Sequence, residues 1–272
     1  AGREPFFSPD SRSVAFFNER GLIRVALDGG APQLLVPGVD GSGAWGRGGV
    51  IVFSAGERLQ RVDAAGGAPR QLTTPDVSLG ERGHLWPSFL PDGRTVLFTT
   101  VLQNGFSIGA VDVASGRRHV VVNDASYGRY AANGYLLYWT APTPTLMAAP
   151  FDPAKAEVTG PGVPVLQGLG STGGRGSACY DVSGNGTLIY RGGGNLEASN
   201  AVVSVDRKGA VDPLLRKKQR TGLVSPIERL DRDALARRRL STPEHSFGRF
   251  PPCDQRRGAV MVGTEEDGSH PG

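Results

Sequence analysis

The sequence predicts an all-β protein, a β-propeller of four-stranded antiparallel blades. Three observations predict it. A block made of an aromatic residue, a Pro-Asp turn and an apolar strand recurs along the chain, and a second, hairpin-forming block recurs between its copies. The chain also contains 40 Gly and 20 Pro, as expected for short strands joined by many turns. Because one such unit cannot bury its own apolar face, the repetition indicates units packed side by side.

The first block is clearest at two places, where 7–12 leads into a strand at 14–16 and 89–94 leads into a strand at 96–98. Weaker copies begin at three further aromatic residues, and the successive spacings are 38, 44, 41 and 50 residues. A period of about 40–45 residues is typical of a four-stranded propeller blade. The residues assigned to this motif are Phe7, Pro9, Asp10, Trp45, Phe89, Pro91, Asp92, Gly93, Tyr130 and Tyr180.

The second block supplies the other two strands of each unit. It recurs at Leu22–Leu35, Leu59–Leu72, Ile108–Val121 and Val202–Leu214, each time as a strand, an Asp/Gly turn and a second strand. Glycine provides the positive φ that a tight hairpin turn needs. Five units of four strands therefore cover about residues 5–215.

The two blocks together resemble the WD40-like repeat of the TolB propeller family, in which six blades are expected and five are recognisable here. Four local stretches, 43–46, 80–87, 158–161 and 181–188, resemble a subgroup appended to bacterial membrane-bound serine/threonine protein kinases. That resemblance implies a sensory or interaction module of a larger signalling protein, and a periplasmic or extracytoplasmic location if the propeller is attached to such a kinase. It implies binding rather than chemistry.

Residues 216–272, at the position of the sixth blade, lack the repeat. They carry 12 Lys/Arg and 8 Asp/Glu, whereas residues 1–215 carry 18 of each, so the net charge of +4 comes from this tail. We expect a five-bladed propeller over 1–215, and a tail over 216–272 that is poorly ordered or the product of a shifted reading frame. The chain begins inside a blade, which is typical of a fragment.

Motifs for catalysis and for cofactors do not emerge from the sequence. Two glycine-rich stretches, 41–46 and 168–173, match the letters of a dinucleotide fingerprint, but strands follow them where that motif needs a helix. Nucleophile-elbow and kinase motifs are absent, and the histidines lack metal-ligand spacing. The sequence therefore predicts no catalytic residue, no metal, no cofactor and no enzyme activity in this chain itself.

Other partners are also constrained. The basic tail intersperses Asp and Glu among its Arg, which disfavours nucleic-acid binding. The longest apolar runs are strand-sized, so no membrane span is expected. Cys179 and Cys253 lie far apart in the sequence and define neither a disulfide framework nor a metal site, and Cys179 is expected to be a small buried thiol.

The remaining hypothesis is binding of a protein or peptide at the loops around the propeller's central channel. The long loops at 75–87 and 168–178 are the candidates, with Arg82, His84, Trp86 and Arg175 as contact residues. His84 has packing as an alternative role. Two readings of the larger protein stay open: a kinase whose catalytic domain lies upstream, and the propeller domain of a serine peptidase.

Overall fold

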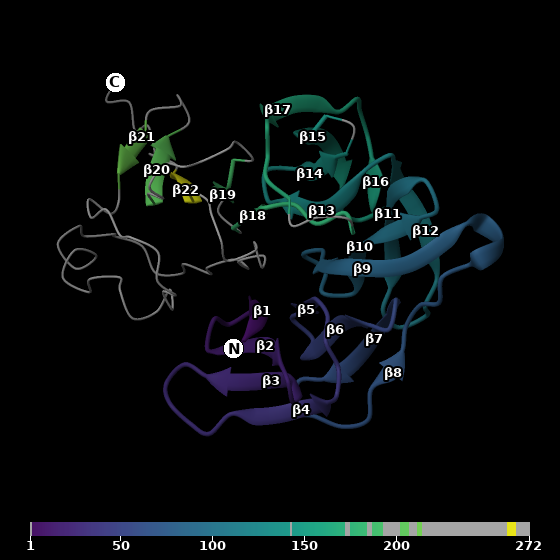
Figure 1. Ribbon diagram of the computed structural model, residues 1–272, viewed down its shortest axis with the longest axis vertical. Helices are drawn as coiled ribbons and strands as arrows, with labels where there is room; N and C mark the ends of the chain where they lie inside the picture. Colours follow the sequence, from purple (N-terminus) through teal and green to yellow (C-terminus); the bar gives the residue numbers. More distant parts are fainter. Residues whose placement is uncertain are drawn as a thin grey trace.

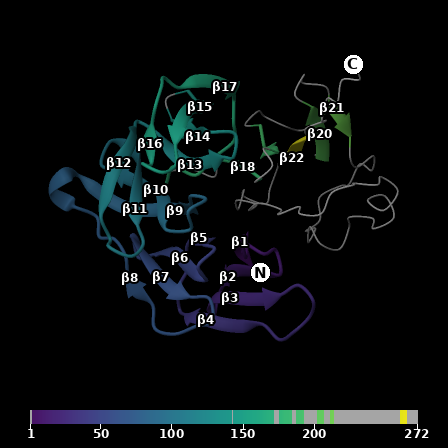
Figure 2. The ribbon, with the colours of Figure 1, turned by 180° about the vertical axis from the view of Figure 1, so that it is seen from behind.

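Five β-sheets follow one another around a common centre in the computed structural model (Figure 1). The structure describes residues 2–141, 143–171, 175–183, 187–192, 202–206, 211–213 and 260–264. Seen from behind, the first strands of the five sheets (β1, β5, β9, β13 and β18) lie toward the centre, and β4, β8 and β12 lie at the periphery (Figure 2). This radial order is that of a β-propeller, so the predicted fold class is confirmed.

The first three sheets are four-stranded and antiparallel, with strands in the order of the sequence. A short 3-10 helix, η1 (Val77–Leu79), connects the second sheet to the third. The strands are β1 (Arg3–Phe7), β2 (Ser13–Asn18), β3 (Gly21–Ala26), β4 (Gln33–Pro37), β5 (Gly43–Trp45), β6 (Val50–Ala55), β7 (Arg58–Asp63), β8 (Arg70–Gln71), β9 (Glu81–Phe89), β10 (Thr95–Leu102), β11 (Gly105–Asp112) and β12 (Arg118–Asn123).

The fourth and fifth sheets depart from the simple repeat. In the fourth, β15 pairs with both β16 and β17 along its length. In the fifth, β22 lies between β19 and β20 and runs parallel to β20. The strands are β13 (Ser126–Ala131), β14 (Tyr135–Thr140), β15 (Thr145–Asp152), β16 (Glu157–Val158), β17 (Val163–Gln167), β18 (Tyr180–Val182), β19 (Leu188–Tyr190), β20 (Val202–Asp206), β21 (Val211–Pro213) and β22 (Val260–Thr264).

Strand β22 corrects the expectation that the fifth unit is antiparallel throughout and is drawn from residues before 215. Its apolar Val260, Met261 and Val262 form a short β-type run that pairs with β19 and β20. The boundary at residue 215 stays a prediction, because most of 216–272 lies outside the described residues.

The Pro-Asp turns form as predicted. The carboxylate of Asp10 accepts hydrogen bonds from the backbone N–H of Arg12 (3.0 Å) and from the Ser8 hydroxyl. The carboxylate of Asp92 accepts from the backbone N–H groups of Arg94 and Thr95, both at 2.9 Å. At the next position Gly93 has φ 66° and Ser11 has φ 56°, so the serine adopts the left-handed conformation that the repeat reserves for glycine.

The strand register places four of the five motif aromatics at one equivalent position and the fifth, Tyr180, at another. Each of the four pairs with the second strand directly beyond the turn: Phe7 with Val14, Trp45 with Ile51, Phe89 with Val96, and Tyr130 with Leu136. In the fifth sheet this position belongs to Val182, opposite Leu188, whereas Tyr180 lies two residues earlier, opposite Tyr190. The motif was assigned to the nearest aromatic residue, whereas a valine occupies the equivalent position in this sheet.

Apolar side chains fill the space between neighbouring sheets and hold the arc together. Phe6, Phe17 and Phe53 join the first sheet to the second, with ring centroids 6.4 Å apart along the series. Burying each such side chain contributes roughly 1.5–3 kcal/mol. Two arginines add polar links between sheets: Arg24 donates to the carbonyl of Ala64 (3.2 Å), and Arg61 to that of Val113 (2.6 Å).

Cys179 is buried, as expected, but it is not a thiol. It is disulfide-bonded, and the described part of the chain has no free cysteine. A large separation in the sequence does not determine whether a cysteine forms a disulfide, so the prediction of a thiol was wrong. Within the described residues, no helix has the length and apolar character needed to cross a bilayer.

Candidate functional site

Three inner strands carry the same irregularity. Strands β1, β9 and β13 each pair with the second strand of their own sheet, and each pairing has a register shift that contains a residue with positive φ. These residues are Glu4 (φ 51°), Trp86 (φ 56°) and Tyr127 (φ 56°), each three positions before the motif aromatic of its strand. Such a conformation costs about 1–3 kcal/mol for a non-glycine residue. A bulge of this kind redirects a side chain and is frequent near functional sites.

Two of these residues border a cavity of about 380 Å³ at the start of the inner strands. It is lined by the first three sheets and by the segment that precedes the fifth. We call it the mouth pocket and define it by its main polar and aromatic side chains: Arg3, Asp40, Ser42, Glu57, Trp86 and Arg175. Glu4 and Gly41 also line it. At Gly41 a side chain would collide with the carbonyl oxygen of Ser54, so this close approach requires glycine.

Glu57 is placed in the mouth pocket by a tight hairpin between β6 and β7. Gly56 (φ 56°) and Glu57 (φ 67°) are the central residues, and two positive φ values are typical of a type I′ turn. The carbonyl of Glu57 accepts a hydrogen bond from the His84 backbone N–H (3.1 Å). Its carboxylate lies over Gly83, where a Cβ would displace it, and pairs with the Arg175 guanidinium. The turn therefore fixes the backbone of Glu57, and the ion pair with Arg175 positions its carboxylate.

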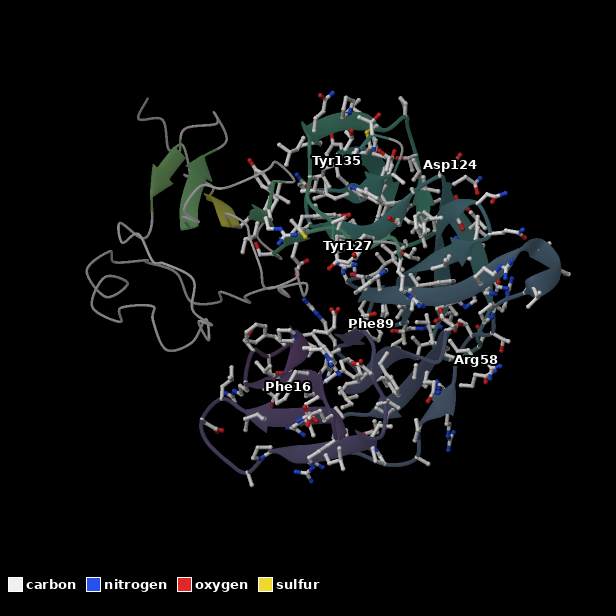
Figure 3. The ribbon with its side chains drawn as sticks, in the orientation of Figure 1. Phe16, Arg58, Phe89, Asp124, Tyr127 and Tyr135 are labelled. Carbon is white, nitrogen blue, oxygen red and sulfur yellow. The ribbon has the colours of Figure 1, made fainter. Side chains whose placement is uncertain are left out.

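Trp86 holds the other side of the mouth pocket. Its indole N–H donates to the carbonyl of Arg175 (2.8 Å), and its backbone N–H donates to the Ser42 hydroxyl (3.0 Å). Its ring packs on that of Tyr127, with centroids 5.5 Å apart. Figure 3 shows Tyr127 nearer the middle of the arc than the outer residues Arg58 and Asp124. Two residues predicted from the sequence, Trp86 and Arg175, thus meet directly, although they lie 89 positions apart.

Behind Trp86, a buried cluster joins the fourth and fifth sheets. The rings of Tyr127 and Tyr180 lie 5.4 Å apart, and the Arg129 guanidinium stacks 3.9 Å from the centre of the Tyr127 ring. The Tyr180 hydroxyl is within hydrogen-bond distance of the carbonyls of Tyr127 and Leu137. Burial raises the pKa of Tyr180 well above its usual range, so the hydroxyl stays a donor. Tyr180 therefore has a structural role, though not the role of a blade anchor.

His84 is not brought to the mouth pocket. It is 0% exposed, and its ring packs against Phe98 with centroids 4.8 Å apart. Its Nδ1 lies 2.7 Å from the Thr73 hydroxyl, and its Nε2 lies 3.2 Å from Oε2 of Glu81. Because a carboxylate only accepts, Nε2 carries the proton and Nδ1 accepts from Thr73. This placement corrects the expectation that His84 contacts a partner.

Glu81 and Arg118 complete this arrangement, which we call the interblade cluster (Thr73, Glu81, His84, Arg118). Arg118 makes two hydrogen bonds to the Glu81 carboxylate, at 2.6 and 3.0 Å. Burial lowers the pKa of His84 to about 4 despite the opposing attraction of Glu81. Burial would raise the pKa of Glu81, but the hydrogen bonds from Arg118 and from the Asp76 N–H hold it below its usual value.

The interblade cluster resembles the hydroxyl–imidazole–carboxylate series of a hydrolase, but its burial argues for a structural role. Thr73 is 5% exposed, so its hydroxyl has no route to a substrate. Arg82 is the fourth contact residue predicted from the sequence. It is exposed on strand β9, which also carries His84 and Trp86, but it does not line the mouth pocket. Glu57 was missed by sequence reasoning, although the pair Gly56-Glu57 between two strands was a visible hairpin signal.

Comparisons with known proteins identify the fold. No family model matches the sequence, and no curated protein matches it either. A putative TolB from Agrobacterium tumefaciens superimposes with a TM-score of 0.57 at 15% identity, over 74% of this chain and 73% of that one. TolB from Acinetobacter baumannii gives 0.52 at 18% identity, over 77% of this chain and 51% of that one, so the match spans about half the length of that protein. The predicted TolB-like β-propeller is thereby confirmed as a fold.

The sequence predicted that this chain is not an enzyme, because it lacks catalytic motifs. That prediction is wrong, since a protein named as an enzyme shares the fold. A putative gluconolactonase has the same fold, with a TM-score of 0.51 at 14% identity over 70% of this chain and 71% of that one. Function resides in sites placed on a fold, and a propeller builds its site from strand ends that are scattered in sequence. Contiguous motifs are therefore a poor guide to catalysis in this architecture.

Proposed function

We propose that this chain is a binding propeller that takes a peptide or protein segment at the mouth pocket. The observation that carries the proposal is the distribution of backbone strain. Seven non-glycine residues in the described part of the chain have positive φ, and three of them, Glu4, Glu57 and Trp86, line this one pocket. Strain of this kind concentrates at ligand clamps, where its cost is offset by the surrounding structure.

The chemistry of the mouth pocket suits a polypeptide. Trp86 offers an aromatic face, the type of side chain most enriched at binding hot spots. Asp40 and Arg3 are more than a third exposed and carry opposite charges, and Ser42 adds a hydroxyl. A volume of about 380 Å³ is at the small end of ligand sites, and it accommodates one or two side chains of a bound segment.

The larger setting that we propose is an interaction module of a bacterial signalling protein. Support comes from the sequence resemblance to propellers attached to membrane-bound kinases. A propeller suits this role because its loops accept a partner without disturbing the blades.

The test is a heptapeptide array probed with the wild-type chain, Trp86→Ala and Arg82→Ala. Arg82 is the matched control, because it is exposed on the same strand and lies outside the pocket lining. We expect a set of peptides bound by the wild type and by R82A but lost, by tenfold or more, in W86A. Urea unfolding of each variant verifies that it is folded. An array with no bound peptide, or with peptides retained by folded W86A, would overturn the proposal.

A further inference from the structure

We propose that the mouth pocket recognises an arginine side chain of its partner and that Arg175 is a built-in occupant which the partner displaces. This inference rests on the proposed function and specifies the chemistry of the bound segment.

Arg175 contacts the two pocket residues, Glu57 and Trp86, that we expect to bind the partner. Its guanidinium pairs with the Glu57 carboxylate across 118 positions of sequence, and its carbonyl accepts from the indole of Trp86. The side chains of Arg175 and Glu57 are 53% and 44% exposed. Ion pairs at such exposure contribute little to stability, so a competing cation can exchange with Arg175.

The charges around Arg175 favour a cation in its place. Apart from Arg175, the described residues that line the pocket include the carboxylates of Asp40 and Glu57 and the guanidinium of Arg3. Arg3 is paired with Asp40 at 3.0 Å. Moving Arg175 away therefore leaves an excess of negative charge beside an aromatic ring.

Arginine fits this combination better than lysine. A planar guanidinium pairs with a carboxylate through two parallel hydrogen bonds and also stacks on an indole. Glu57 is preorganised for such pairing, because its tight turn and the bond from the His84 N–H fix its backbone. Preorganisation lowers the entropic cost of binding.

The experiment compares two tripeptides, acetyl-Gly-Arg-Gly-amide and its citrulline counterpart, which has nearly the same shape without the charge. Binding is measured by calorimetry to the wild type, Arg175→Ala, and the double variant Arg175→Ala/Glu57→Gln. We expect R175A to bind the arginine peptide about three- to fivefold more tightly than the wild type. In the double variant, the added Glu57→Gln change should reduce that binding to the level of the citrulline peptide. Arg58→Ala is the control, since Arg58 is exposed in the same hairpin and lies outside the pocket lining.

Three results would overturn the inference: equal binding of the two peptides, no gain in R175A, or no binding of the arginine peptide to R175A. Failure of the inference alone is distinguishable from failure of the proposed function. The heptapeptide array is therefore also probed with the single variant Glu57→Gln: peptides that are lost in W86A but retained in E57Q would keep the mouth pocket as the binding site and remove its preference for arginine.

Discussion

Strand β9 contributes to two polar sites that lie two residues apart and differ in burial, strain and completeness. The interblade cluster is closed around its histidine: His84 is 0%, Thr73 5% and Glu81 6% exposed, both ring nitrogens of His84 are engaged, and only Arg118 reaches partly into solvent. The mouth pocket is open, and its central ion pair is about half exposed. Its backbone is strained at Trp86, whereas His84 has no positive φ.

The contrast shows how one strand serves both stability and recognition. In a regular strand, His84 and Trp86 would share a face, because side chains alternate with a period of two. The bulge at Trp86 breaks that period, so the histidine packs on Phe98 between the second and third sheets and the indole packs on Tyr127. Buried polar groups with all partners satisfied stabilise the fold, and strained exposed groups remain available to a ligand.

The largest effect on the free energy of unfolding is expected when a charge is removed from the interblade cluster. Glu81→Gln removes the partner of Arg118 and of His84 while keeping the side-chain volume. The substitution leaves the Arg118 guanidinium, which is 29% exposed, without its carboxylate and weakens a buried contact of His84, so we expect the free energy of unfolding to fall by about 2–3 kcal/mol. Urea unfolding measures it. Glu57→Gln, which breaks the open pair, should change the same quantity by less than about 1 kcal/mol. Equal effects would show that the two sites do not differ energetically.

The next effect is a dependence of stability on pH that arises from His84. Its pKa is about 4 in the folded chain and 6.5 when unperturbed, so the unfolded state binds the proton first. The stabilisation is complete above pH 6.5 and is lost as pH falls toward 4. By pH 5 the expected loss is about 2 kcal/mol. Glu81, whose pKa is lowered, adds a further loss only below its ordinary value of 4.5.

His84→Gln isolates the histidine contribution. Its unfolding free energy should be lower than that of the wild type at pH 7, and the difference should shrink by about 2 kcal/mol at pH 5. Parallel stability curves for the two proteins between pH 7 and 5 would contradict the assignment to His84.

The features that could be predicted from the sequence are those formed by residues close together in the chain. The Pro-Asp turns and the Asp/Gly hairpins were readable because Asp10 and Asp92 bond to backbone groups two or three residues away. The five sheets followed from repetition of those local signals. Two of the four residues predicted to contact a partner, Trp86 and Arg175, line the mouth pocket, although Trp86 lies in strand β9 and not in the long loop that the sequence predicts.

The rest depended on geometry that no local pattern encodes. The environment of His84 depends on Thr73, in the loop after β8, and on Arg118 of β12, which binds Glu81, and the role of Glu57 depends on Arg175 from across the ring. The insertion of β22 into the fifth sheet joins segments more than 50 residues apart in the sequence. The chemistry of the candidate site was therefore less predictable than its scaffold.

The smallest expected effect on stability comes from relieving backbone strain at two residues with positive φ, one in the mouth pocket and one outside it. Glu57 (φ 67°) and Ser11 (φ 56°) occupy conformations that glycine adopts at no steric cost. Replacing either by glycine relieves about 1 kcal/mol of strain and returns part of it as chain entropy, so both Glu57→Gly and Ser11→Gly should raise the free energy of unfolding by a few tenths of a kcal/mol. Only E57G should lose binding of the arginine peptide, because Ser11 lies in a blade turn outside the pocket lining. Urea unfolding and calorimetry on the same samples check both quantities. Retained binding in E57G would mean that the strained carboxylate does not serve recognition, and a loss in S11G would place the ligand elsewhere on the propeller.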